Sequence, residues 1–270
     1  MNRPKDKAFR FGERTASMHR VDIRRMLRSR LLYILLLTAL LIPVLMTVMM
    51  TMMDGSESVN PQTGEITVIE GPDNTWQSIG AFPTDSGAAM GGMDVLSMCN
   101  INMMFMLVAV FVCLFTAEDF RSGYAKHLFA VRAAKGDYIV SKTLTGFAVG
   151  ASMLILYTLG AVLGGAIAGL SFGLQGLSVA NLILCLLSKV CLMLVFVSIF
   201  VLISVAAKQK AWLSIVGSLG GGMLLFMTVP LITPLSSTVV NVFLCLAGGV
   251  LFALGLGAVS RYILKTTALV

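Results

Sequence analysis

Residues 31–53 read LLYILLLTALLIPVLMTVMMTMM, an apolar run without a charged residue. A helix needs about 20 such residues to cross the hydrocarbon core of a bilayer. Further apolar runs lie at about 97–117, 143–169, 179–206, 212–230 and 240–262. The sequence therefore predicts an all-α integral membrane protein: a cytoplasmic segment 1–30, then a six-helix transmembrane domain in residues 31–270.

The composition excludes a soluble protein. Hydrophobic residues make up 57% of the 270 residues, charged residues only 12%, and the mean hydropathy is +0.90. Soluble domains are about 25% charged, because their surface must face water. The same figures exclude collagen-like, disordered and disulfide-framework proteins.

The net charge of +7 follows the predicted topology. Ten of the 20 Lys and Arg residues precede Leu31, and five lie between Phe120 and Thr143, whereas residues 54–94 carry seven acids and no Lys or Arg. Basic loops stay in the cytoplasm. We therefore expect a multi-pass protein of the cell membrane with both termini cytoplasmic and an extracellular loop at 54–96. The first apolar run is interpreted as a retained span, and no nucleic-acid partner is expected.

Little in the sequence indicates catalysis. The five cysteines show no CxxC or Cys/His spacing, which argues against a zinc site and a disulfide framework. No phosphate-binding GxxxxGK[ST] loop is present, and the two histidines, His19 and His127, do not suggest a catalytic triad. We expect no enzyme activity, no cofactor and no metal site in this chain.

The first charged stretch, Ser17–Arg30, reads SMHRVDIRRMLRSR. Apolar residues recur at helical spacing and charged residues occupy the remaining positions; the apolar set is Met18, Val21, Met26 and Leu27. With Ser17 as N-cap, this pattern predicts an amphipathic helix on the inner leaflet that leads by an elbow into the first span. A solvated basic tail that only fixes topology is the alternative.

The second charged stretch lies between the second and third spans. Glu118 and Asp119 fall where a span must leave the membrane, since a carboxylate at mid-bilayer is costly. Ser122-Gly123 predicts a break, residues 124–134 a short helix that exposes Leu128, Phe129 and Val131, and Gly136-Asp137 another turn. A connection of this length suggests a docking element.

This stretch resembles the signature of ABC-2 type transporter permeases. The matching features are an acidic residue after the second span, Ser-Gly, a Leu-rich short helix, a basic residue and Ser-Lys at the third span; here they are Glu118, Ser122-Gly123, Leu128, Arg132 or Lys135, and Ser141-Lys142. The order of amphipathic helix, six spans and cytoplasmic ends is also similar. The chain departs from the family pattern in having Tyr124 after the glycine and Ala133-Ala134 before the basic residue.

The resemblance implies a transport subunit. Residues 118–142 would be the coupling segment, with a coupling helix at 118–132 that docks on a separate ABC ATPase; the docking residues are Glu118, Arg121, Tyr124, Leu128, Phe129 and Arg132. ATP and magnesium would bind to that partner, and a second permease chain would complete the exporter within the membrane lipids. The segment with Pro230 and Pro234 fits either a re-entrant hairpin or a plain turn.

Lys189 is the basic residue that lies inside an apolar run. A charge at this depth costs at least about 2.5–3.5 kcal/mol on insertion scales. One interpretation places Lys189 on a translocation path near Asn100 and Asn102 or near Ser188. The other is a lysine that reaches an interface through its long side chain.

Two features of the outer side complete the prediction. Eleven of the 18 methionines lie near the outer ends of the first two spans, which indicates plain packing, a pliable surface for greasy ligands or, less favoured, a Cu(I) route. The acidic loop contains EITVIE at 65–70 and could form a small hairpin with an interfacial helix around Thr75–Phe82.

Together these patterns predict the permease subunit of an ATP-driven exporter of an amphipathic substrate: an antimicrobial or other peptide, a lipid or a hydrophobic drug. The alternatives are a membrane immunity or binding protein that sequesters a peptide without transport, and a copper-handling permease. A secondary transporter is disfavoured because the spans hold almost no titratable groups.

Overall fold

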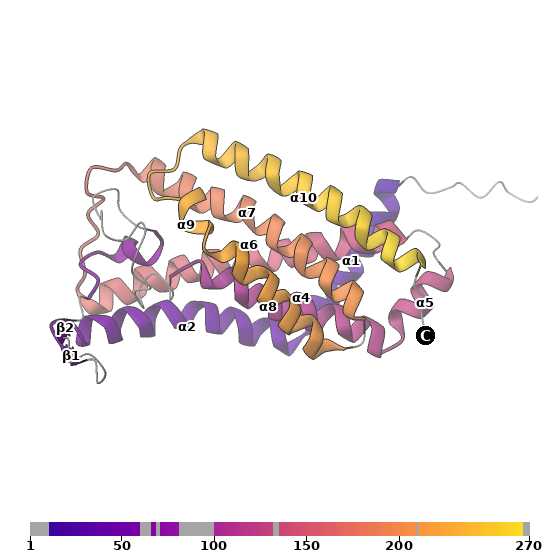
Figure 1. Cartoon of the computed structure of the whole chain (residues 1–270), viewed down its shortest axis with the longest axis horizontal. Helices are drawn as coiled ribbons and strands as arrows, with labels where there is room; N and C mark the ends of the chain where they lie inside the picture. The colour runs from indigo at the N-terminus through magenta and orange to yellow at the C-terminus, as the bar shows by residue number, and fades with distance from the viewer. Residues whose placement is uncertain are drawn as a thin grey trace, which may run out of the picture.

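The computed structural model describes residues 11–59, 66–68, 71–80, 100–131, 135–208 and 210–266. Its long helices form one elongated bundle (Figure 1). The bundle helices are α2 (Arg30–Met52), α4 (Met103–Arg121), α6 (Lys135–Ala168), α7 (Val179–Ala207), α8 (Ala211–Phe226) and α10 (Val239–Thr266). The shorter elements are α1 (Phe11–Arg28), α5 (Tyr124–Val131), α9 (Val229–Ile232), the 3-10 helix η1 (Thr75–Ser78) and the strands β1 (Glu57–Val59) and β2 (Ile66–Val68).

Within the described residues, five helices are long and apolar enough to cross a membrane: α2, α4, α6, α7 and α10. The protein is therefore a helical, membrane-embedded chain, as the sequence predicts. The predicted fifth span, 212–230, is divided between the 16-residue helix α8 and the short helix α9. At 1.5 Å per residue, α8 is about 24 Å long, short of the roughly 30 Å hydrocarbon core. The sixth crossing therefore stays a prediction.

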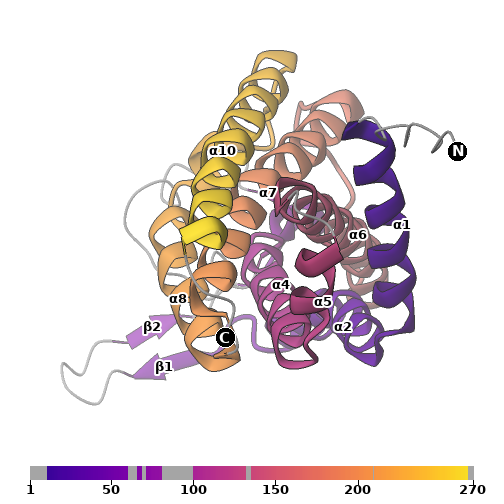
Figure 2. The same ribbon diagram turned by 90° about the vertical axis from the view of Figure 1, so that its right-hand side faces the viewer.

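Helix α7 lies at the centre of the bundle and packs against α10, α4, α8 and α6. Helix α6 also packs along α2 and α1, so that α1 lies on the flank of the bundle (Figure 2). Helices α1 and α5 and the end of α10 lie at one end of the molecule, and β1 and β2 lie at the other (Figure 1). We call these the α5 end and the β end.

The two helices that flank the coupling segment extend into it beyond the predicted spans. Helix α4 begins at Met103, because Asn100 and Asn102 form a turn ahead of it, and it continues to Arg121 instead of ending near 117. Helix α6 begins at Lys135, eight residues earlier than predicted. Gly136-Asp137 is accordingly helix, not a turn, and the Asp137 carboxylate is buried and pairs with Arg14 at 3.4 Å. The predicted break at Ser122-Gly123 is confirmed, since Gly123 takes a φ of +74°.

At the β end, the predicted outer hairpin has a counterpart in two paired strands. β1 and β2 are antiparallel, with Ser58 opposite Thr67. The helix expected around Thr75–Phe82 is only the four-residue η1, and residues 81 and 82 lie outside the described part of the chain. Asn74 caps η1 and donates a hydrogen bond to the carbonyl of Gly173 at 2.6 Å. This contact fastens η1 to the connection between α6 and α7.

The buried and exposed positions of helix α1 differ from the predicted amphipathic pattern. It begins at Phe11 in the described part of the chain, so Ser17 lies inside it and is not an N-cap. Met18 and Met26 are buried as expected, but Val21 and Leu27 are 43% and 51% exposed. The inward position between Met18 and Met26 is filled by Asp22, which is fully buried. The inward face of α1 therefore carries a charge, and this charge determines what α1 packs against.

Small residues bring α6 close to α2. A Cβ added at Gly160 would lie 2.2 Å from the carbonyl oxygen of Leu40 and 2.7 Å from Pro43 Cγ. Such small residues allow close helix contacts in membranes. Gly248 and Gly255 of α10, in contrast, have open space where a Cβ would stand.

Substituting Gly160→Ala should therefore destabilise the protein, because the methyl group must displace the backbone of α2. We expect a loss of about 1–3 kcal/mol, the usual cost of overpacking, measured as a lowered midpoint of thermal unfolding in detergent. Gly248→Ala is the matched control and should leave the midpoint unchanged or slightly raised. Equal midpoints for the two variants would contradict the α2–α6 packing.

Candidate functional site

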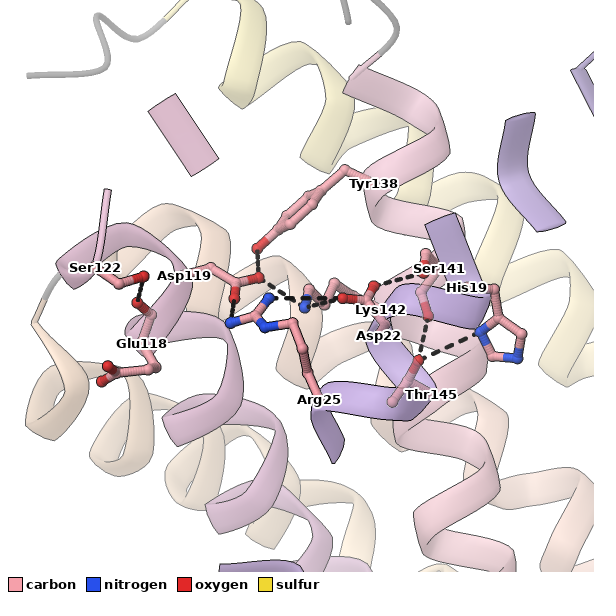
Figure 3. Close-up of polar contacts among 10 residues, drawn as sticks. All are labelled: His19, Asp22, Arg25, Glu118, Asp119, Ser122, Tyr138, Ser141, Lys142 and Thr145. Atoms are coloured by element: carbon pink, nitrogen blue, oxygen red, sulfur yellow. Dashed lines mark hydrogen bonds and ion pairs between the residues drawn. The ribbon is translucent and has the colours of Figure 1, made fainter. Parts of the chain in front are cut away.

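At the α5 end, three helices meet at a buried group of four charged side chains. α1 contributes Asp22 and Arg25, α4 contributes Asp119 and α6 contributes Lys142 (Figure 3). Asp22 and Asp119 are fully buried, Lys142 is 2% exposed and the side chain of Arg25 is 29% exposed. We call these four residues the ionic cluster.

The Lys142 ammonium lies between the two carboxylates. Its Nζ is 2.9 Å from Asp22 Oδ1 and 2.7 Å from Asp119 Oδ2. Arg25 Nη2 is 2.6 Å from Asp119 Oδ1, and Arg25 Nη1 is 3.8 Å from Asp22 Oδ1. Each acid therefore contacts both bases, and every ion pair but Arg25–Asp22 joins two different helices.

Two hydroxyl groups of α6 complete the cluster. Ser141 donates to Asp22 Oδ2 at 2.6 Å, and Tyr138 donates to Asp119 Oδ2 at 3.0 Å. Removing charges from water costs several kcal/mol per ion, and only good geometry with further hydrogen bonds offsets that cost. Two acids and two bases also cancel in formal charge. The cluster is thus self-compensating within this chain.

Aromatic rings enclose the two cations. Lys142 Nζ lies 3.9 Å from the centroid of the Phe115 ring, and the Arg25 guanidinium lies 4.2 Å from that of Tyr124, the first residue of α5. Burial works against the charge of Arg25, but Asp119 and Asp22 outweigh it, so the pKa of Arg25 lies above its ordinary value. Burial, followed by the Asp22 carboxylate, raises the pKa of Tyr124. At neutral pH Arg25 is therefore charged and Tyr124 is neutral.

The structure divides the predicted docking residues into two groups. Leu128 and Phe129 are partly buried and pack against the core, so they are less exposed than the sequence predicts. The Phe129 ring meets that of Tyr138 edge-on at 5.3 Å. Tyr124 is likewise half-buried on Arg25. These three side chains attach α5 to the bundle.

Glu118 and Arg121 form the second group and are exposed at the end of α4. In the described part of the chain neither side chain makes an ion pair (Figure 3 shows Glu118 turned away from the ionic cluster). The exposed residues of α5 itself are Lys126, His127 and Ala130. Arg132 and the loop residues 133–134 lie outside the described part, as does the side chain of Val131.

Lys189 and Asn102 are in direct contact, as their pairing in the sequence analysis suggests. Lys189 is 1% exposed and donates to Asn102 Oδ1 and to Thr233 Oγ1, both at 2.9 Å. Asn100 supports the site indirectly, because its Oδ1 accepts from the backbone N–H of Asn102. Lys189 is therefore held inside the bundle and does not extend to a surface.

Both partners of Lys189 stand at helix ends. Asn102 precedes the first residue of α4, and Thr233 follows the last residue of α9. Lys189 itself is ten residues into α7, about 15 Å from the start of that helix. Broken backbone at membrane depth is tolerated where protein satisfies its polar groups or where it lines a water-filled cavity. Through these two hydrogen bonds Lys189 links the break before α4 and the break after α9 to the continuous helix α7.

Sequence reasoning noted the members of the ionic cluster without connecting them. In the sequence pattern Asp22 is one of the charged residues outside the apolar set of Ser17–Arg30, and Asp119 is explained only by the end of a span. One signal was available: Asp22 is the only acidic residue between Glu13 and Asp54. A single carboxylate in a segment so rich in arginine is a candidate for a buried ion pair. Its pairing with Lys142, 120 positions away, could be found only from the fold.

Comparison with known proteins adds no relative. The chain matches no protein-family model. Neither the curated proteins nor the solved structures gave a match. We therefore infer a function from the two buried charged sites and from the position of α5.

Neutralising one acid of the ionic cluster should destabilise the protein strongly. Asp119→Asn leaves the charges of Lys142 and Arg25 with only Asp22 to balance them, and breaking a buried ion pair typically costs about 3–5 kcal/mol. Thermal unfolding in detergent measures the effect. The neighbouring Glu118→Gln removes the same charge at an exposed position and should change the midpoint little. Adding Lys142→Met to Asp119→Asn restores the charge balance and should recover part of the loss.

Proposed function

We propose that this chain is the permease subunit of an ATP-driven exporter of the ABC-2 kind, which moves an amphipathic substrate outward with a separate ATPase. The supporting observation is the position of α5, a short helix between two membrane-spanning helices that exposes polar residues on one side and is attached to the ionic cluster on the other. This is the arrangement expected of an element that receives force from a partner and transmits it to several helices.

In this proposal the contacts of α5 with the bundle transmit that force. Tyr124 lies on Arg25 of α1, and Phe129 lies against Tyr138 of α6. Arg25 and Tyr138 both contact Asp119, at the end of α4. A displacement of α5 by a docked ATPase would therefore move α1, α4 and α6 together. In this proposal the exposed side of α5 is the docking surface, defined as Lys126, His127 and Ala130.

Lys189 belongs to the proposed translocation path. Among the described residues its hydrogen-bond partners are neutral, Asn102 and Thr233. A cation in this environment would attract the polar part of a passing substrate more strongly than a neutral side chain would. Asn102 and Thr233 stand at helix ends, so a rearrangement of these breaks would change access to the ammonium.

The docking surface is tested by reversing its charge. The double variant Lys126→Glu, His127→Glu should lower co-purification of the proposed ATPase partner at least roughly tenfold, which corresponds to a loss of about 1.4 kcal/mol or more of binding free energy. Arg20→Glu, exposed on α1, is the control and should keep the ATPase bound. Unchanged binding of the double variant would contradict the assignment. Leu128→Asp is unsuitable because Leu128 packs on the core.

Lys189→Leu tests the path. Transport should fall while the protein still inserts into the membrane and assembles with its ATPase, because the substitution removes a charge that is costly for insertion. ATP-dependent uptake of the substrate into inverted vesicles, whose lumen corresponds to the outside of the cell, and the amount of protein in the membrane fraction measure the two effects separately. Full export by the variant would remove Lys189 from the path. Export abolished together with ATPase binding would instead indicate a purely structural role.

A further inference from the structure

The 3-10 helix η1 lies on the β-end side of the Lys189 site. Helix α7 begins at the β end (Figure 1), and Lys189 is ten residues further along it. The Ser78 carbonyl at the end of η1 accepts a hydrogen bond from the backbone N–H of Ile101 at 2.9 Å. A Cβ added at Gly80 would lie 3.1 Å from Leu235 Cγ. Together with Gly80, η1 therefore contacts both the chain ahead of α4 and the chain after α9.

These contacts lie beside the two hydrogen-bond partners of Lys189. Ile101 directly precedes Asn102, and Leu235 is two residues after Thr233. Asn102 and Thr233 accept the hydrogen bonds of the Lys189 ammonium. The side chains at this junction are at most 1% exposed: Ile79, Ile101 and Leu235. The residues that hold the ammonium are thus continuous with an apolar junction at η1.

Hydrogen bonds to an exposed connection hold η1 in this position. Asn74 Nδ2 donates to the carbonyl of Gly173 at 2.6 Å, and Trp76 Nε1 donates to the carbonyl of Phe172 at 3.1 Å. Residues 171–173 of the α6–α7 connection are exposed, so water can replace these bonds. A single 3-10 turn has little stability of its own. Elements held mainly by solvent-exposed hydrogen bonds are the ones that open locally.

The contact of η1 with α6 leaves one polar atom without a partner. Thr75 is 2% exposed, and a Cβ added at Gly165 of α6 would lie 2.9 Å from Thr75 Cβ. The Thr75 Oγ1 makes no hydrogen bond to the described residues. Burying a hydroxyl without a hydrogen bond is unfavourable. The closed position of η1 is therefore stabilised less than a fully satisfied contact would be.

We propose that η1 is a closure on the β-end side of Lys189, which opens by leaving the α6–α7 connection. The chain beside Asn102 and Thr233 then loses its contacts with η1, and the ammonium becomes accessible from the β end. The use of this opening to release a substrate rests on the proposed function. The opening itself needs only the membrane-embedded chain.

Cys185 reports the opening without any substrate. This free cysteine is fully buried four residues before Lys189 on α7, and its Sγ lies 3.5 Å from the Thr233 carbonyl. The full-length protein in lipid nanodiscs is treated with a charged maleimide, and mass spectrometry of the Cys185 peptide gives the labelling rate. Asn74→Ala removes the cap of η1 and its bond to the connection, so it should raise this rate roughly tenfold. Ser56→Ala, exposed at the same end, is the control and should label like the wild type.

A disulfide should produce the opposite change. Asn74 pairs with Ser171 in an isolated bridge, and Asn74 Nδ2 lies 3.1 Å from Ser171 Oγ, so cysteines at these positions can be joined. In Asn74→Cys, Ser171→Cys, oxidation should lower Cys185 labelling below the wild-type rate, and reduction should raise it above that rate. Equal labelling in the wild type, Asn74→Ala and both redox forms would overturn the closure. Labelling that follows η1 supports the closure even where Lys189→Leu exports fully, a result that removes only Lys189 from the path.

Discussion

The pairing of Asp22 and Asp119 with Lys142 and Arg25 is the interaction on which the α5 end depends. Helix α1 buries Met18 and Met26 in the core, and its one inward carboxylate, Asp22, also meets the Lys142 ammonium of α6 at 2.9 Å. The low dielectric of the interior makes each of these pairs strong and makes any unpaired member costly. The cluster therefore specifies one relative arrangement of α1, α4 and α6 more sharply than apolar packing alone could.

That specificity explains how a short helix such as α5 can have a defined position. Eight residues are too few for a stable isolated helix. α5 is instead attached at Tyr124 to a cation of the cluster and at Phe129 to the ring of Tyr138, which itself donates to Asp119. Leu128 and Phe129, two of the apolar residues that the sequence suggested as a contact for a partner, are therefore used inside the chain. Among the side chains of α5 that the structure describes, Lys126, His127 and Ala130 remain exposed, so docking there would depend on charge.

The sequence predicts the fold better than it predicts the site, for physical reasons. Span length follows from bilayer thickness, so the helices that begin at Arg30, Val179 and Val239 agree with the prediction to within about one residue at these ends. The errors fall where polar residues are buried. The turn predicted at Gly136-Asp137 is helix instead, because Asp137 and Lys142 have ion-pair partners on other helices and α6 continues through them. Such ion-pair partners lie at distant positions in the sequence, so no periodic pattern of residues indicates them.

The two buried charged sites differ in a way that bears on their roles. In the ionic cluster, two acids face two bases, so the charges cancel without anything from outside the chain. Lys189 has only the oxygens of Asn102 and Thr233 as described hydrogen-bond partners, and these carry no net charge. A self-compensated cluster has little electrostatic reason to bind a ligand and is suited to holding helices together while they move. A buried lysine whose described hydrogen-bond partners are both neutral, held between two helix breaks, is the better candidate for contact with what crosses the membrane, and this contrast favours Lys189 over the cluster for the proposed path.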